Sequence, residues 1–144
     1  MTTALYDTDF YQWTVKQADL LRNEDYAELD LDNLIEEIEG MASKDKRSLR
    51  SRTRVLLTHL LKLSQMPTGD PVRGWRLTVR DQRHEIENEL IDSPSLKQYL
   101  IDQIPDAYTL ARGDAADAMS IDASSFPAHC PWTPDQILDL DWLP

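Results

Sequence analysis

The sequence predicts an all-α protein, an antiparallel bundle of about five or six helices with an extended strap near its C-terminus. Apolar residues recur every three or four positions along most of the 144 residues, which is the spacing of one helix face. The chain holds only 4 glycines, and most of its 8 prolines stand where helices should start or stop. No segment alternates apolar and polar residues as a strand would. We therefore expect one helical domain over residues 1–144.

The first two predicted helices belong to an acidic N-terminal region. The first spans about Thr8 to Arg22, with Asp7 or Thr8 as its cap. The second starts after Asp30 as its N-cap residue. We expect both to turn an apolar face to the core: Phe10, Trp13, Gln17, Leu20 and Leu21 on the first, and Leu31, Leu34, Ile35, Ile38 and Met41 on the second.

The third predicted helix, from about Ser43 to Gln65, should form the centre of the bundle because its later half is apolar nearly all round. Pro67 ends it, and Asp70-Pro71 predicts the start of a fourth helix that reaches about Ile91. The inward-facing residues are Leu49, Thr53, Leu56, Leu60 and Leu63 on the third helix and Trp75, Val79, Ile86 and Leu90 on the fourth.

The C-terminal third predicts two further helices and the strap between them. Ser93-Pro94 should start a helix that carries Leu96, Tyr99, Leu100 and Ile104 inward, and Pro105 should kink or split it. Beyond Pro105, alanines 107, 111, 115 and 118 offer a smooth face for close packing. Residues 120–132 are expected to form the strap, anchored by Phe126 and Trp132, and Thr133-Pro134 opens a last short helix.

Composition narrows the class of protein. The longest apolar run, Val55 to Leu63, is far shorter than the roughly 20 residues of a membrane span, and the N-terminus has no secretory pattern. A single cysteine, Cys130, cannot form an internal disulfide, which favours the cytoplasm. The formal net charge of -11 disfavours nucleic acid and anionic membranes as partners.

Charge is segregated along the chain. Residues 1–42 hold 11 acids and 2 bases, residues 43–85 hold 4 and 11, and residues 86–144 hold 11 and 2. In the basic block Arg73, Arg76, Arg80 and Arg83 recur on one helix side next to Trp75, and Arg47, Arg50 and Arg54 do likewise. These stripes can pair with acidic helices of the same domain, bind nucleic acid or phosphate, or form a groove for an acidic partner protein. The acidic surroundings favour internal pairing.

Other polar patterns point to no established chemistry. Glu36, Glu37 and Glu39 lack the histidine of a di-metal bundle and indicate a solvated or ion-paired face. A partly buried His59 among leucines could shuttle protons, but a hydrogen bond to a carbonyl or carboxylate is the simpler interpretation. His84-Glu85 lacks the second histidine of a zinc-protease helix, and Cys130 is expected to pack as a small apolar residue. We expect no metal and no cofactor.

Three functions remain open. The preferred one is a non-enzymatic interaction module that binds a protein partner or forms a homo-oligomer. The second is an enzyme or small-ligand binder with a cleft between the second, third and fourth helices, where Glu36, His59, Arg76 and Arg80 would meet. The third is a nucleic-acid binder through Arg47, Arg50 and Arg54. The candidate ligand-binding residues are Glu36, Glu37, His59, Trp75, Arg76, Arg80 and Arg83.

Several motifs in this order also resemble the bacterial "domain of unknown function 29" family. They are LYDTDF at 5–10 with Trp13, LDLDNLIEEIE at 29–39, LLTHLLK at 56–62, Trp75-Arg76, Arg83, SPSL at 93–96, FPAHCP at 126–131 and Leu143-Pro144. The likeness covers nearly the whole chain, with Leu63 standing where the family usually has an aromatic residue. The resemblance implies a helical fold and identifies no activity, ligand or catalytic residue.

Overall fold

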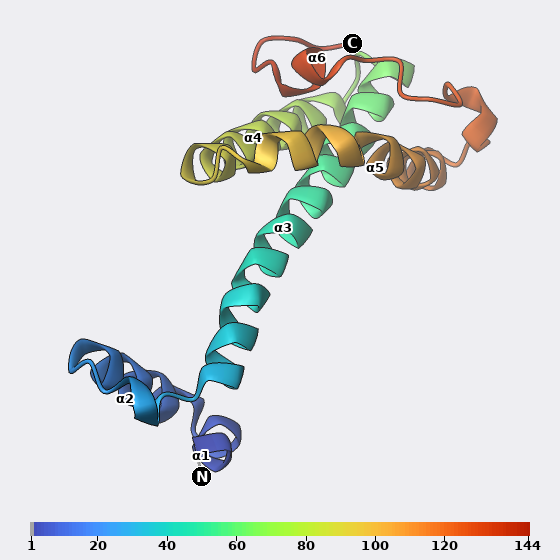
Figure 1. Ribbon diagram of the computed structural model, residues 1–144. Coiled ribbons are helices and arrows are strands. Elements are labelled where there is room, and N and C mark those ends of the chain that lie inside the picture. Colours follow the sequence, from blue (N-terminus) through green and yellow to red (C-terminus); the bar gives the residue numbers. More distant parts are fainter. Residues whose placement is uncertain (1) are drawn as a thin grey trace. The chain divides into compact units, whose positions relative to one another are not determined.

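The computed structural model describes residues 2–144, with side chains from Leu5 onward. This part of the chain contains six α-helices, two short 3-10 helices and no strand, which confirms the predicted all-α class (Figure 1). The chain divides into an N-terminal unit, Met1–Lys44, and a C-terminal unit, Asp45–Pro144. The single domain expected from the sequence stays a prediction.

The N-terminal unit contains α1 (Thr2–Thr8), α2 (Phe10–Arg22), the 3-10 helix η1 (Tyr26–Glu28) and the beginning of α3 (Leu31–Gln65). Asp9 caps α2, because its carboxylate accepts a hydrogen bond of 3.1 Å from the backbone amide of Gln12. The predicted caps Asp7 and Thr8 are wrong, since both residues belong to α1. The face expected to be buried on α2 is also narrower than predicted: Trp13 and Gln17 are buried, whereas Phe10 and Leu21 are exposed.

Helix α3 is one continuous helix of 35 residues, where the sequence predicted two. The expected break lay between Met41 and Ser43. Only Gly40 weakens the helix there, by about 1 kcal/mol relative to alanine, and no proline occurs between residues 31 and 65. The helix therefore continues through this region, and Ser43 does not start a new one.

The core of the C-terminal unit lies where α4 (Val72–Asp92) and α5 (Leu96–Met119) pack with the C-terminal half of α3 (Figure 1). The predicted central position of the third helix is confirmed, since Leu49, Leu56 and Leu60 are fully buried. Val79 and Ile86 of α4 join them, with Trp75 and Leu90 partly buried at the margin.

The starts of α4 and α5 differ from the prediction, and α5 is not split at Pro105; the alternative, a kink there, stays a prediction. Asp70 does not cap α4, which begins at Val72 without a side-chain cap. Ser93 and Pro94 form a turn, in which the Leu96 amide donates to the Ser93 carbonyl at 3.0 Å, and α5 follows. The helix then continues through Pro105, which is exposed to solvent.

Residues 120–144 close the C-terminal unit as the predicted strap and short helix. After η2 (Ala123–Ser125), Phe126 is buried in the core, and Trp132 packs edge-on against Trp142 at 5.8 Å between ring centroids. The Tyr108 hydroxyl of α5 donates a 2.7 Å hydrogen bond to the Pro127 carbonyl. The predicted start at Thr133-Pro134 is confirmed by α6 (Pro134–Leu138) and its capping box. Ala118, the last of the alanines that were expected to form a packing face on α5, is exposed, so this face ends before it.

Candidate functional site

The seven candidate ligand-binding residues are divided between the two units. Glu36 and Glu37 belong to the N-terminal unit, and the other five belong to the C-terminal unit: His59, Trp75, Arg76, Arg80 and Arg83. A cleft that would bring Glu36 to His59 and the arginines stays a prediction. Within each unit, however, several of these side chains have partners that define their roles.

Arg83 is a buried anchor for the C-terminal segment. Its guanidinium donates hydrogen bonds to the carbonyls of Ile137 at 2.8 Å, Trp142 at 2.7 Å and Gln136 at 3.3 Å. Burial lowers the pKa of this guanidinium, and the nearby Asp139 acts in the opposite direction. Arg83 therefore holds α6 and the last residues against α4, and its charge is satisfied by carbonyls rather than by an acidic helix.

His59 also bonds to the backbone, as the simpler interpretation of the sequence expected. Its Nδ1 lies 2.8 Å from the Val55 carbonyl, which can only accept, so Nδ1 carries the proton. Burial lowers the pKa of His59; the hydrogen bond to Val55 raises it, and the positive charge of Lys62 lowers it. The half-buried ring is therefore held in its neutral form.

The remaining arginines of the α4 stripe are exposed. Arg80 pairs at 3.4 Å only with Asp81, its neighbour in the chain, and Arg76 donates to the Pro67 carbonyl at 3.4 Å. In the described part of the chain, no carboxylate of another helix forms an ion pair with this stripe. Within the C-terminal unit the predicted internal neutralisation is thus wrong for the α4 arginines, because backbone carbonyls surround the buried Arg83 and the other three side chains are exposed. Pairing of this stripe with the acidic N-terminal helices stays a prediction.

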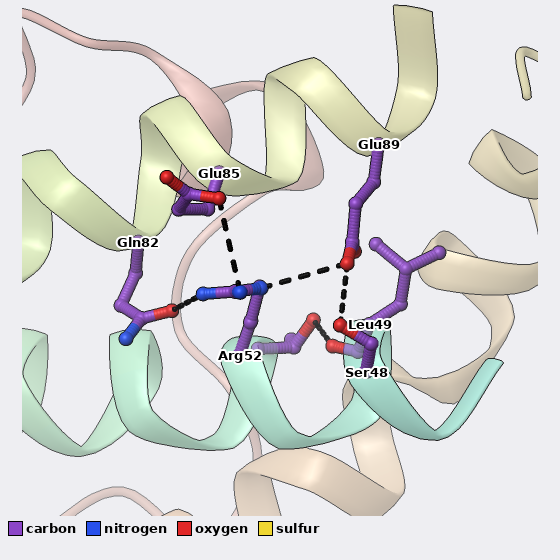
Figure 2. A network of polar contacts seen from close by, with 7 residues as sticks. Ser48, Leu49, Arg52, Gln82, Glu85 and Glu89 are labelled. Carbon is purple, nitrogen blue, oxygen red and sulfur yellow. Dashed lines mark hydrogen bonds and ion pairs between the residues drawn. The ribbon is translucent and has the colours of Figure 1, made fainter. Parts of the chain in front are cut away.

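Internal pairing does occur on α3. Arg54 forms a bidentate pair with Asp114 of α5, at 2.5 and 2.8 Å, which confirms pairing with the acidic C-terminal third. This contact lowers the pKa of Asp114 and raises that of Arg54. Arg52, which the sequence analysis missed, lies 3.8 Å from Glu85 and 3.6 Å from Glu89 of α4 (Figure 2).

A groove of the C-terminal unit lies between α3 and α5 and has a volume of about 560 Å³. Arg50 donates to the Tyr99 hydroxyl at 3.2 Å, and the Lys46 ammonium lies 5.0 Å from the centre of the same ring. The charged residues that line it come from both helices: Arg47, Arg50 and Arg54 from α3, and Asp102 and Asp106 from α5. Asp114 neutralises Arg54, and the other charged lining residues are two arginines and two aspartates. This surface therefore carries mixed charge.

The N-terminal unit is built around Trp13, the only buried apolar side chain among its described residues. The Trp13 indole donates to the Asp30 carboxylate at 3.0 Å, and the Asp30 amide donates to the Gln17 side chain at 2.9 Å. Tyr6 packs edge-on against Trp13 and donates its hydroxyl to Glu37. That hydrogen bond, with smaller contributions from desolvation and nearby acids, raises the pKa of Tyr6 to about 12. Glu37 therefore has a structural role in joining α1 to α3.

An apolar face of α3 stays exposed in the N-terminal unit. It comprises Leu31, Ile35, Ile38 and Met41, whose exposed fractions are 57%, 52%, 63% and 66%. The prediction that this stripe faces the core is wrong. A sequence signal for the long helix existed: Leu31, Ile35, Ile38 and Ala42 step by four, three and four, in phase with the buried Leu49 and Leu56.

An acidic edge borders the apolar face. Asp32 precedes Ile35 by three positions and Glu39 follows it by four, so both are neighbours of Ile35 on the helix surface. Glu36 lies on the same side of the helix, farther from the apolar face. All three carboxylates are exposed. None of them forms an ion pair within the described residues. The first three turns of α3 thus present an apolar strip with negative charge along one side.

Neither a metal centre nor a membrane span emerges from the described residues. No group of three or more His, Cys, Asp or Glu side chains is placed to hold a metal ion. No helix is both long and apolar enough to cross a membrane. Cys130 is half-buried, with its thiol 3.6 Å from the Trp132 carbonyl, and burial raises its pKa.

Comparison with known protein families identifies the family of this chain. The family model described as "Domain of unknown function DUF29" matches residues 5–143, so the chain belongs to that family. No curated protein and no solved structure matches the chain. The surfaces described above are therefore the basis for any functional conclusion.

Proposed function

We propose that this member of the DUF29 family is a protein-interaction module whose N-terminal unit binds another protein through the apolar face of α3. The observation that carries the proposal is the exposure of Leu31, Ile35, Ile38 and Met41. Exposed apolar residues scattered singly need no explanation, whereas a contiguous patch on a helix is typical of an interaction site.

The distribution of exposed apolar side chains supports the proposal. Of the 15 large apolar side chains that are exposed in the described residues, nine belong to the N-terminal unit. That unit provides only 44 of the 144 residues. Its apolar surface is therefore concentrated well beyond its share of the chain.

The small core of the N-terminal unit also supports a role in binding another protein. Folded segments below about 40 residues usually need a disulfide, a metal or a partner chain, because they bury too little apolar surface to offset the loss of conformational entropy. The N-terminal unit is barely above that size and buries a single apolar side chain, Trp13, among its described residues. A partner that covers the apolar face would supply the missing burial.

Site-specific photo-cross-linking in the cells of origin tests this proposal. A photoreactive amino acid is placed at Ile38, which is 63% exposed, and separately at Ile91 of α4, which is 67% exposed. We expect discrete protein adducts from position 38 and none from position 91. Adducts of equal yield at both positions, or none at position 38, would refute the proposal.

A further inference from the structure

We propose that the apolar face of α3 takes a basic amphipathic helix of a partner protein. This inference rests on the proposed interaction role of the N-terminal unit and adds the chemistry of the partner. The spacing of the apolar face, the charge beside it and the charge of the N-terminal unit as a whole support this partner.

The spacing of the apolar face favours a helix as the occupant. Three residues of this face, Leu31, Ile35 and Ile38, and the neighbouring exposed Ala42 follow one another at intervals of four, three and four residues. Residues with this spacing lie along one seam of a helix, and two such seams pack side by side with their side chains interlocked. The exposed seam covers about three turns of α3, which matches a short partner helix.

The charge beside the seam selects a basic partner. Asp32, Glu36 and Glu39 form an exposed acidic edge, and no basic residue occurs between positions 31 and 43. In paired helices, residues that flank the apolar seam form ion pairs that determine partner choice. Lysine or arginine on the flank of the incoming helix would form ion pairs with the carboxylates of this edge, whereas glutamate would be repelled by them.

The same charge argues against a second copy of this chain as the occupant. The N-terminal unit holds 11 acids and only three bases, Lys16, Arg22 and Lys44. A symmetric dimer through the apolar face would bring two acidic edges together, because a two-fold interface places the same surface on both sides. Like charges juxtaposed at an interface disfavour association.

Two synthetic peptides test the inference with the full-length protein. Both are three-heptad helices with leucine along one seam, flanked by lysine in one peptide and by glutamate in the other, and both are used below their self-association concentration. Fluorescence anisotropy of the labelled peptides should show saturable binding of the lysine peptide, at least about tenfold tighter than the glutamate peptide, and weakening as salt increases.

Matched variants locate the binding surface and its charge. The variant Ile38→Ser should reduce lysine-peptide binding at least about fivefold, whereas Ile91→Ser should leave it unchanged. The triple variant D32N/E36Q/E39Q should weaken binding about tenfold. The control E87Q/D92N/D117N removes the same number of charges from exposed positions of the C-terminal unit and should have no effect. Circular dichroism establishes that each variant is folded.

The outcomes separate this inference from the proposed function. Equal binding of both peptides, or equal loss in the two triple variants, would overturn the basic-helix partner while cross-linking at Ile38 could still support an interaction role. Sedimentation that shows a dimer abolished by Ile38→Ser would identify a second copy as the occupant and overturn the inference. Absence of both peptide binding and cross-links at Ile38 would remove both proposals.

Discussion

At the scale of single residues, Arg83 and His59 show how backbone carbonyls can satisfy side chains that resemble functional groups. The sequence placed both among the candidate ligand-binding residues because of their charge pattern and their apolar neighbours. The Val55 carbonyl is the partner of His59, as the simpler interpretation of the sequence expected. For Arg83 the structure provides partners that the sequence could not, namely the carbonyls of α6 and the last residues. Contacts between distant segments depend on packing, which residue spacing along one helix does not reveal.

Replacing Arg83 with methionine tests its anchoring role. Arg83→Met should lower the free energy of unfolding by about 3 kcal/mol, because three carbonyls lose their donor and the C-terminal segment loses its anchor. The matched control Arg80→Met, on the exposed side of α4, should cost less than about 0.5 kcal/mol. Urea unfolding followed by circular dichroism measures both. A loss below about 1 kcal/mol for Arg83→Met would contradict this role.

His59 should make the protein less stable in mild acid. Because burial lowers its pKa in the folded state, the unfolded chain binds a proton more readily. The stabilisation from the neutral ring is complete above the unfolded pKa of about 6.5 and is lost as the pH falls below it. His59→Gln, which cannot titrate, should therefore lose less stability between about pH 7 and pH 5 than the unmodified protein.

A titration of the histidine checks this assignment. Nuclear magnetic resonance should place the pKa of His59 below its ordinary value of about 6.5. A pKa above that value, or identical pH profiles for the His59 variant and the unmodified protein, would show that the ring is not held neutral by burial.

At the scale of elements, helix positions were more predictable than helix ends. The periodic leucines of α3 and the inward residues of α4 and α5 were identified correctly because burial of one face produces the pattern directly. The start signals at Asp70 and Ser93 failed, since a capping residue competes with local turns whose energies are similar. The predicted division of α3 failed because one glycine costs too little to end a helix stabilised by a buried half.

Gly40 offers a test of the continuity of α3. A side-chain carbon added at Gly40 meets nothing within 4 Å, so Gly40→Ala should stabilise the helix by up to about 1 kcal/mol. Hydrogen exchange of the amides around residue 40 should slow accordingly. Gly69→Ala is the contrasting control and should destabilise, since Gly69 has a φ of 128° and its added carbon would lie 3.3 Å from Met66. Faster exchange around residue 40 in Gly40→Ala would indicate a break in the helix.

At the scale of the whole molecule, the two units differ in how much apolar surface they bury. The core of the C-terminal unit contains 18 buried residues, whereas the described N-terminal unit buries only Trp13 among its apolar side chains. The sequence could not reveal this difference, because an apolar stripe has the same spacing whether it faces its own core or a partner. The apolar face of α3 was therefore located correctly on the helix and assigned to the wrong environment.

Hydrogen exchange should detect the difference in stability between the units. Amides of α2 should exchange at least about a hundredfold faster than those of α4 and α5 in the isolated protein, because local opening of the N-terminal unit exposes little apolar surface. Mass spectrometry of peptic fragments measures both regions in one experiment. Equal protection of α2 and α5 would show that the N-terminal unit is stable by itself.

The continuity of α3 has a consequence for how the apolar face would meet a partner. Starting a helix is the unfavourable step, while extending one adds a hydrogen bond for each residue fixed. The buried half of α3, around Leu56 and Leu60, supplies that nucleus, and the exposed half at Leu31–Met41 is an extension of it. An incoming chain would therefore dock on a helix that is already formed, so the cost of ordering backbone would fall mainly on that chain.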